Sequence, residues 1–145
     1  MQDQACVFCK IISGQIPAEK IYEDDLVLAI LDHRPVREGH TMVIPKKHID
    51  HFIDLDDDLA GHICKVGNLL GKKIQTVLKP QRVGFVVSGF GVPHAHYHVI
   101  PLFEKHDITS SQYISKEFGE VTFNMDRISA VDGKRESEFA SLLRC

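Results

Sequence analysis

Three histidines, His94, His96 and His98, stand at alternate positions of one short segment. In an extended strand, alternate side chains project from the same face, so the imidazoles would share one surface, about 6.5–7 Å apart along the chain. The opposite face would carry Ala95 and Tyr97, which suit a core. Near neutral pH an imidazole is a proton carrier, a nucleophile or a metal ligand, so the segment is the first candidate for chemistry.

The histidine segment allows three interpretations. A solvent-facing polar stripe does not need histidine, because Lys, Thr or Glu would serve there as well. One metal bound by all three is strained, because the outer pair lies about 13 Å apart at Cα on the strand rise. The third interpretation divides the work: one histidine serves elsewhere, and two perform acid–base or nucleophilic chemistry on a phosphate or acyl group.

Cys6 and Cys9 form a C-x-x-C pair, which is half of a common tetrahedral zinc site. Redox-active or merely buried thiols fit the same spacing. His48, at the end of I-P-K-K-H, and His94 would complete a Cys2His2 set. All four positions would then be filled by protein, which is typical of a structural metal that ties distant segments together.

The elements that must position these groups follow from periodicity and turn signals. A long helix is predicted over residues 54–79, because apolar residues recur at helical spacing, acidic residues fill its first turn and Pro80 follows it. A short helix is predicted over residues 7–13, ending at Gly14. Strands between turn residues are predicted over residues 19–23, 26–31, 40–45, 83–88 and 95–102. This order predicts an α+β meander on an antiparallel sheet.

The last forty residues carry weaker patterns. A strand is expected over residues 118–124, and a helix over residues 134–143 with Phe139, Leu142 and Leu143 on one side. The remaining histidines are interpreted as surface residues without a role: His33, His51, His62 and His106.

Length and composition restrict the class of protein. A chain of 145 residues suits one domain, and its 43% apolar and 26% charged residues are typical of a globular protein. A net charge of -3 argues against binding a nucleic acid polymer, although not against one nucleotide. No apolar run approaches the roughly 18 residues of a membrane span, and the N-terminus has no signal-peptide pattern. We therefore expect no membrane partner and a cytoplasmic location, where four cysteines would stay reduced.

The run H-A-H-Y-H-V-I resembles the signature of the histidine triad (HIT) superfamily of nucleotide hydrolases and transferases. The segments C-x-x-C-K-I-I-S-G-Q-I-P-A-E-K-I-Y-E-D-D and L-A-I-L-D-H-R-P-V-R-E-G-H-T-M-V-I-P-K-K-H extend the similarity from Cys6 to about Glu104, as in bacterial and Hint-like members. The resemblance implies a HIT-like fold with a five-stranded antiparallel sheet, one long helix and a short N-terminal helix. It also implies a homodimer whose sheets join. We accordingly expect a histidine triad domain over residues 1–105 and an extension over residues 106–145 packed on it.

The resemblance also implies roles for particular residues. His96 would attack the α-phosphate of a purine nucleotide, of AMP or GMP type, and form a nucleotidyl-histidine. His98 would contact that phosphate, and His40 would support the triad from the neighbouring strand. Asp32 would hold the ribose hydroxyls; the alternative is that it is only a turn residue. The positions that would sandwich the base, and that would otherwise be core, are Phe8, Ile11 and Ile30. The zinc ligands of zinc-bearing members match Cys6, Cys9, His48 and His94.

These roles predict a purine nucleotide hydrolase that cleaves at the α-phosphate, with a structural zinc and no organic cofactor. Two alternatives stay open: a nucleotide sensor or adaptor with little turnover, and a nucleotidyltransferase. One departure bears on this choice. In the loop Ser88–Pro93, Gly91 stands where the family has a hydroxyl residue that serves the leaving group, and Phe90 stands where it has Gln.

Overall fold

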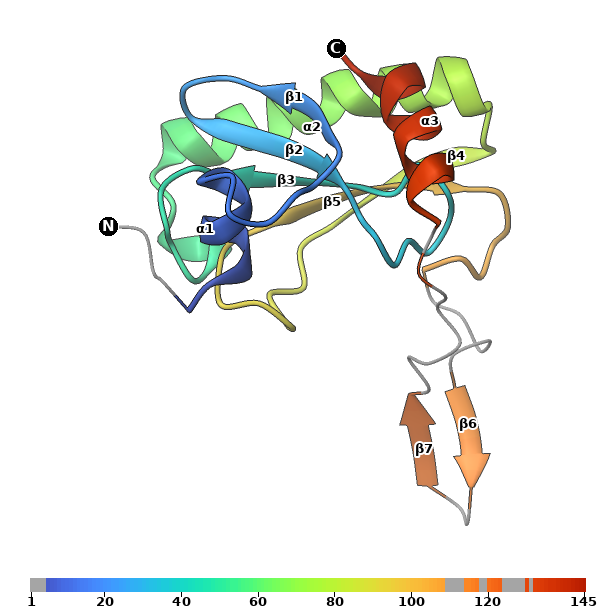
Figure 1. Ribbon diagram of the computed structural model, residues 1–145. Coiled ribbons are helices and arrows are strands. Elements are labelled where there is room, and N and C mark those ends of the chain that lie inside the picture. The colour runs from blue at the N-terminus through green and yellow to red at the C-terminus, as the bar shows by residue number, and fades with distance from the viewer. Residues whose placement is uncertain (1–4, 109–113, 118–119, 124–129, 131) are drawn as a thin grey trace.

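The computed structural model describes residues 5–108, 114–117, 120–123, 130 and 132–145. Five strands form one antiparallel sheet in the order β1-β2-β3-β5-β4 (Figure 1). Their bounds are β1 Lys20–Glu23, β2 Val27–Leu31, β3 Thr41–Pro45, β4 Arg82–Val86 and β5 Tyr97–Leu102. The predicted α+β fold with a five-stranded antiparallel sheet, one long helix and a short N-terminal helix is confirmed.

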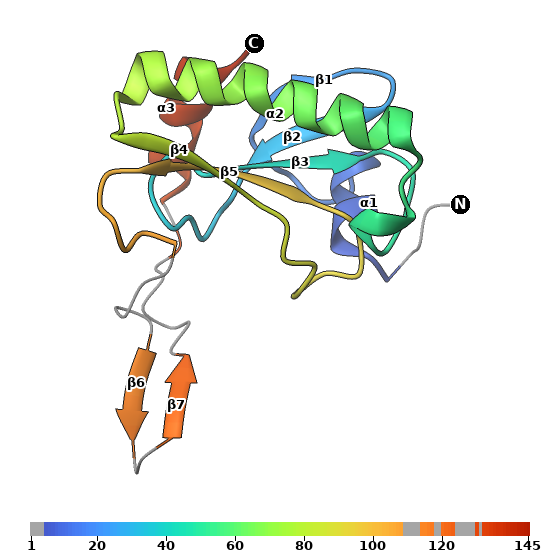
Figure 2. The same ribbon diagram turned by 180° about the vertical axis from the view of Figure 1, so that it is seen from behind.

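The long helix α2, Asp57–Leu78, lies across one face of the sheet (Figure 2). It begins later than predicted because Asp56 is its N-cap, with a carboxylate oxygen 2.8 Å from the Leu59 N–H. The residues just before it form a separate 3-10 turn, η1, Phe52–Asp54. Lys79 ends the helix in the left-handed conformation, with φ 52°.

Strand alternation divides the apolar side chains between the two faces. Val27, Ala29 and Val43 face α2 and form the main core with its buried stripe. Leu28 and Ile30 face the other side, where the short helix α1, Val7–Ile12, packs on them. Burial on both faces explains why β2 is apolar throughout and why β3 is apolar from Met42 to Pro45.

The histidine segment enters the sheet later than predicted, because β5 begins at Tyr97 rather than at Ala95. The backbone before it bonds elsewhere: the Ala95 N–H donates to the Ile49 carbonyl at 2.7 Å. The alternation nevertheless holds, with Ala95 and Val99 buried in the core that faces α2.

The C-terminal part contains a separate hairpin and a helix. The hairpin pairs β6, Ile114–Glu117, with β7, Glu120–Phe123, so the predicted strand at 118–124 corresponds to β7 alone, and residues 118, 119 and 124 lie outside the described residues. The predicted helix is α3, Gly133–Leu143, which packs against α2 and β1. Leu143 is buried, but Leu142 is 53% exposed, so the predicted apolar face was wrong at that position.

The division into a domain over residues 1–105 and an extension stays a prediction. Among the described residues, no helix combines the length and the apolar character needed to cross a membrane.

Candidate active site

The three histidines of the central segment serve two different places. His94 is fully buried and turns toward Cys6 and Cys9, whereas His96 and His98 line a cavity of about 1300 Å³ on the face of the sheet that carries α1. This arrangement agrees with the interpretation that divides the work between the histidines.

The hydrogen bonds of His96 determine its tautomer. Its Nδ1 lies 2.7 Å from the His94 carbonyl oxygen, and a carbonyl only accepts, so Nδ1 carries the proton. In the neutral ring Nε2 then has a lone pair, and within the described part of the chain it has no hydrogen-bond partner. The ring of Phe8 packs edge-on against this imidazole, with centroids 5.5 Å apart. His96 is therefore held in the tautomer of a nucleophile at the cavity wall.

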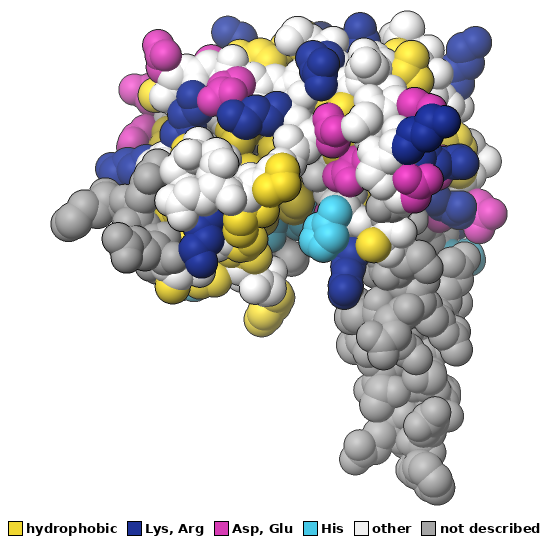
Figure 3. Space-filling view, in the orientation of Figure 1, with side chains coloured by type: hydrophobic (Ala, Val, Ile, Leu, Met, Phe, Trp, Pro, Cys, Tyr) yellow, Lys and Arg dark blue, Asp and Glu magenta, His cyan; other side chains and the backbone are white. Residues whose placement is uncertain are grey.

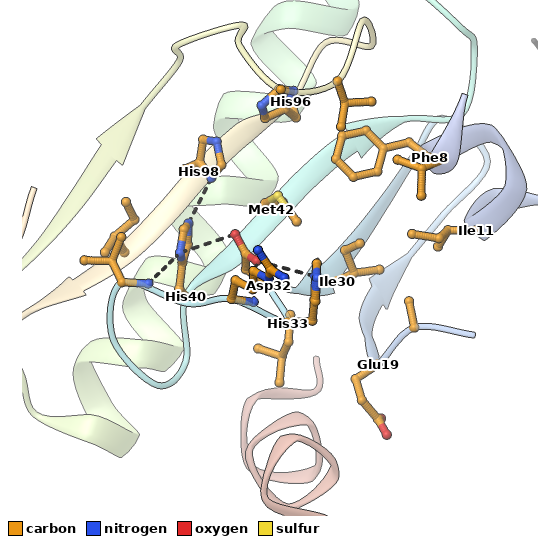
Figure 4. A pocket seen from close by; sticks show the side chains of 18 of the residues that line it. Phe8, Ile11, Glu19, Ile30, Asp32, His33, His40, Met42, His96 and His98 are labelled. Atoms are coloured by element: carbon orange, nitrogen blue, oxygen red, sulfur yellow. Dashed lines mark hydrogen bonds and ion pairs between the residues drawn. The ribbon is translucent and has the colours of Figure 1, made fainter. Parts of the chain in front are cut away.

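A second chain of hydrogen bonds determines the tautomers of His40 and His98. The backbone N–H of Val36 donates to Nδ1 of His40 at 3.3 Å. Nε2 of His40 therefore carries the proton and donates to Nδ1 of His98 at 2.9 Å. Nε2 of His98 is left as an N–H donor beside the nucleophile, since the His96 and His98 rings lie 4.9 Å apart (Figure 4).

Both members of this relay are held neutral. Burial, followed by repulsion from a charge on His98, lowers the pKa of His40 to about 3. Burial, followed by repulsion from His96, lowers the pKa of His98 to about 4. Neutral rings keep the donor and acceptor order described above.

Asp32 lies at the end of β2 on the rim of the same cavity (Figure 4). One carboxylate oxygen accepts the Arg34 N–H at 2.9 Å, and the other lies 3.6 Å from Nδ1 of His40. Burial raises the pKa of this carboxyl, and the Arg34 bond, followed by the charges of His33 and His96, opposes the rise. The Asp32 carboxylate therefore makes a turn contact to the Arg34 backbone and also faces the cavity.

The predicted apolar residues gather on the α1 side of the cavity. Ile30 pairs across the sheet with Met42, and Met42 pairs with His98. Phe8 and Ile11 project from α1 toward Ile30 and Met42 (Figure 4). The structure therefore brings all six predicted nucleotide-site residues, together with His40, to one cavity.

The loop after β4 forms the other side of the cavity. Ser88, Phe90, Gly91 and Val92 line it, and Phe90 is 87% exposed. Gly91 has φ +92°, and a Cβ built there would meet no heavy atom within 4 Å. A side chain at Gly91 would therefore be disfavoured by backbone conformation and not by crowding.

The four predicted metal ligands also come together. Cys6, Cys9, His48 and His94 place their ligand atoms within 4.8 Å of one another. The Sγ of Cys9 lies 3.4 Å from Nδ1 of His48, which lies 3.3 Å from Nδ1 of His94. A tetrahedral zinc with the usual Zn–S and Zn–N bonds separates its ligands by about 3.3–3.8 Å. Nε2 of His94 donates to the Pro45 carbonyl at 2.9 Å, which leaves Nδ1 free to bind a metal. The donor set fits a tetrahedral metal ion.

Several cavity residues were not predicted from the sequence, and His33 and Glu136 are two of them. His33, interpreted as a surface residue, lines the cavity 3.9 Å from Asp32. Glu136 reaches the cavity from α3. The sequence around Glu136 contains no recognisable motif, so nothing in it indicated a residue of the cavity. His62, also interpreted as a surface residue without a role, has a partner outside the cavity, because its Nε2 lies 2.7 Å from the Asp24 carboxylate.

The sheet, the histidine relay and the Cys2His2 cluster define an α+β protein of the histidine triad class. A family model of the HIT domain matches residues 13–105, and the chain belongs to this family. A HIT-like protein of Methanocaldococcus jannaschii is 44% identical over 110 residues, which cover 68% of this chain and 80% of the relative. The adenosine 5′-monophosphoramidase of Schizosaccharomyces pombe is 40% identical over 101 residues, 67% of this chain and 74% of that protein.

Solved structures agree with the fold. The crystal structure of a zinc-bound histidine triad family protein from Mycobacterium smegmatis superimposes with a TM-score of 0.72 at 32% identity. The match covers 97% of this chain and 91% of that protein, so it includes the C-terminal part of this chain.

Proposed function

We propose that the protein is a purine nucleotide hydrolase that cleaves at the α-phosphate through a nucleotidyl-His96 intermediate. The observation that carries the proposal is the unpartnered Nε2 of His96 at the cavity wall, beside the N–H donor of His98. A hydrolase relative, the Schizosaccharomyces pombe monophosphoramidase, supports the reaction class.

The ring nitrogens allow a balanced reaction in two steps. In the first, the lone pair of His96 Nε2 forms a bond to the α-phosphorus, and the bond from phosphorus to the leaving group breaks. The leaving group departs with that electron pair and takes a proton from water. His98 donates to a phosphate oxygen throughout, as a positioned donor to developing charge. In the second step, water attacks the phosphorus, the bond from phosphorus to Nε2 breaks with its electron pair returning to His96, and the nucleotide is released. The proton that this water loses neutralises the hydroxide left by the first step.

The remaining cavity residues suit a purine nucleoside. Phe8, Ile11 and Ile30 offer flat and branched apolar surfaces to a base. Asp32, an acceptor on the rim, suits two ribose hydroxyl donors. These contacts would orient the α-phosphate toward His96, and such positioning supplies much of the rate of phosphoryl transfer.

The Cys2His2 cluster would hold a structural zinc, because all four positions are filled by protein. It would fix α1, the loop after β3 and the backbone of His94, which in turn holds His96. In the proposed cytoplasmic location cysteines would stay reduced and available as thiolate ligands.

The protein is also proposed to be a homodimer. β4 is an edge strand; Phe85 within it and Val87 directly after it are each 44% exposed. An edge of this kind is commonly covered by pairing with a second copy. Light scattering at micromolar concentration should give twice the chain mass, and a monomer would refute this part.

The intermediate gives a direct test. Brief reaction with a nucleoside phosphoramidate, followed by quenching and mass spectrometry, should find one nucleotide on the peptide that carries His96. The variant His96→Ala should lose turnover by at least about a thousandfold yet keep nucleotide binding, because a nucleophile acts mainly in the transition state. His51→Ala, at an exposed position, is the matched control. Activity of His96→Ala near that of the wild type would refute the mechanism.

A binding protein with little turnover is the second candidate. The observation that favours it is Gly91, which offers no side-chain donor to a leaving group. Tight nucleotide binding without any labelled His96 would support this candidate over the hydrolase.

A further inference from the structure

The sugar end of the cavity carries a second carboxylate, and it comes from outside the residues that match the HIT domain. Glu136 on α3 lines the cavity together with Asp32 and Glu19. Burial, followed by the negative charge of Glu19, raises the pKa of Glu136, and Asp32 adds to the rise while His33 opposes it. The three carboxylates therefore lie within electrostatic reach of one another.

Several contacts of α3 fix the position of Glu136. Asp132 caps the helix by accepting the Lys134 N–H at 2.9 Å. Ser137 donates to the Glu19 carboxylate, and Arg135 forms an ion pair with Glu38. In Figure 3, acidic side chains and a histidine lie between the apolar region below α1 and the side of the molecule that carries α3.

Among the three described carboxylates that lie here, the Glu136 carboxylate has no hydrogen-bond or ion-pair partner. Glu19 is engaged by Ser137 and lies 3.8 Å from Arg144. One carboxylate oxygen of Asp32 accepts the backbone N–H of Arg34. Within the described ranges the Glu136 carboxylate makes neither a hydrogen bond nor an ion pair, whereas the backbone N–H of this residue donates to the Asp132 carbonyl. The carboxylate is therefore available to a ligand.

We infer that Glu136 is a specificity-determining residue of this site: with Asp32, it admits nucleotides whose ribose 2′- and 3′-hydroxyls are free and excludes nucleotides with a phosphate on either hydroxyl. The inference rests on the proposed function, because it takes Asp32 to face the ribose. Free hydroxyls donate to carboxylates, whereas a phosphate at that end meets two like charges.

The competing cation is Arg34, whose exposed side chain also lines the cavity. A ligand phosphate drawn to this guanidinium would give the opposite preference, for the phosphorylated sugar. Binding measurements therefore decide whether the site prefers free or phosphorylated ribose hydroxyls.

The test compares AMP with adenosine 3′,5′-bisphosphate and adenosine 2′,5′-bisphosphate by titration calorimetry. The wild type should bind AMP at least about tenfold more tightly than either bisphosphate, as expected for like charges a few ångströms apart at a partly exposed site. Glu136→Gln should reduce that ratio about tenfold while changing AMP affinity less than about threefold. Glu138→Gln, at an exposed position of the same helix, should leave the ratio unchanged.

Two further measurements sharpen the result. The ratio should shrink as sodium chloride is raised, because salt screens exposed charges. Glu136→Lys should favour the bisphosphates.

The outcomes separate this inference from the proposed function. AMP binding with a ratio that is the same in the wild type and Glu136→Gln would overturn the inference alone. A wild-type preference for a bisphosphate would do so as well. Failure of the wild type to bind AMP would overturn the proposed function, and this inference with it.

Discussion

In each site histidine, the contact made by one ring nitrogen determines which nitrogen carries the proton and which keeps a free lone pair. His94 and His96 each donate to a carbonyl oxygen, but through opposite nitrogens: Nε2 in His94 and Nδ1 in His96. One ring therefore offers Nδ1 to the thiol cluster, and the other offers Nε2 to the cavity. Two identical residues two positions apart acquire different chemistry through backbone contacts alone.

The relay from Val36 through His40 to His98 predicts an NMR result. At pH 6 both rings should be neutral, because their pKa values are lowered from 6.5 to about 3 and about 4. Nitrogen-15 spectra should show His40 with a protonated Nε2 and an unprotonated Nδ1, and the same tautomer for His98. Signals of a cationic ring at pH 6 in either residue would contradict the relay.

Gly91 predicts how the rate depends on the leaving group. Loss of one positioned donor typically costs about 2.7–4 kcal/mol of transition-state stabilisation. Leaving groups that are already stable anions, such as phosphates and carboxylates, need the donor least, so they should react faster than alkylamines. The measurement is kcat/KM for nucleotidyl substrates over a range of leaving-group pKa. A wild-type kcat/KM that does not change with the pKa of the leaving group would contradict this prediction.

Gly91→Ser should speed phosphoramidate cleavage, and Gly91→Ala is its necessary control. Both variants must adopt φ +92°, which costs about 1 kcal/mol for a residue with a Cβ. Only the serine adds a hydroxyl. An equal loss of activity in both variants would show strain without any contribution from a donor.

At the scale of elements, the contact between α2 and β5 depends on one glycine. A Cβ on Gly67 would lie 2.6 Å from the Tyr97 ring, and this ring is stacked between Phe52 and Phe85. Gly67→Ala should therefore lower the free energy of unfolding by about 1–3 kcal/mol through overpacking.

Gly61 in the same helix is the matched control, because a Cβ added there would meet no heavy atom within 4 Å. Gly61→Ala should raise the free energy of unfolding by about 0.5–1 kcal/mol from helix propensity. Urea denaturation of both variants checks the pair. A gain in stability for Gly67→Ala would show that the Tyr97 stack moves aside easily.

At the scale of the molecule, the metal cluster joins segments far apart in sequence. Cys6 and Cys9 come from the start of the chain, His48 from the loop after β3 and His94 from the segment before β5. We expect one zinc per chain by elemental analysis, and a strong chelator should lower the melting temperature. Zinc should leave as pH falls, because protons compete for thiolate and imidazole ligands.

Single cysteine variants test the same prediction. Cys6→Ala should lose the zinc and melt at a lower temperature, whereas Cys145→Ala, an exposed cysteine outside the cluster, should keep both. Unchanged metal content in Cys6→Ala would rule out the cluster as the binding site.

Much of this fold follows from local patterns. The apolar period of α2, its acidic first turn, and the buried runs of β2 and β3 predict their elements to within a few residues, because they are set by neighbours in the chain. The alternate histidines, the C-x-x-C pair and the resemblance to the HIT family predicted which residues the structure brings together. Local patterns failed at Leu142, which was predicted to share the apolar face of the helix with Phe139 and Leu143 but is 53% exposed.

Tertiary structure alone decided the remaining features. The tautomers of His94 and His96 depend on carbonyl groups placed by the fold, one of them 49 residues away at Pro45. The place of Glu136 beside Asp32 depends on α3 docking against β1, more than one hundred residues from the strand in sequence. The contacts of His94 with Pro45 and of α3 with β1 join groups far apart in the chain, so no sequence period encodes them. The residue types determined which chemistry was available, and the packing of distant segments determined which atom performs it.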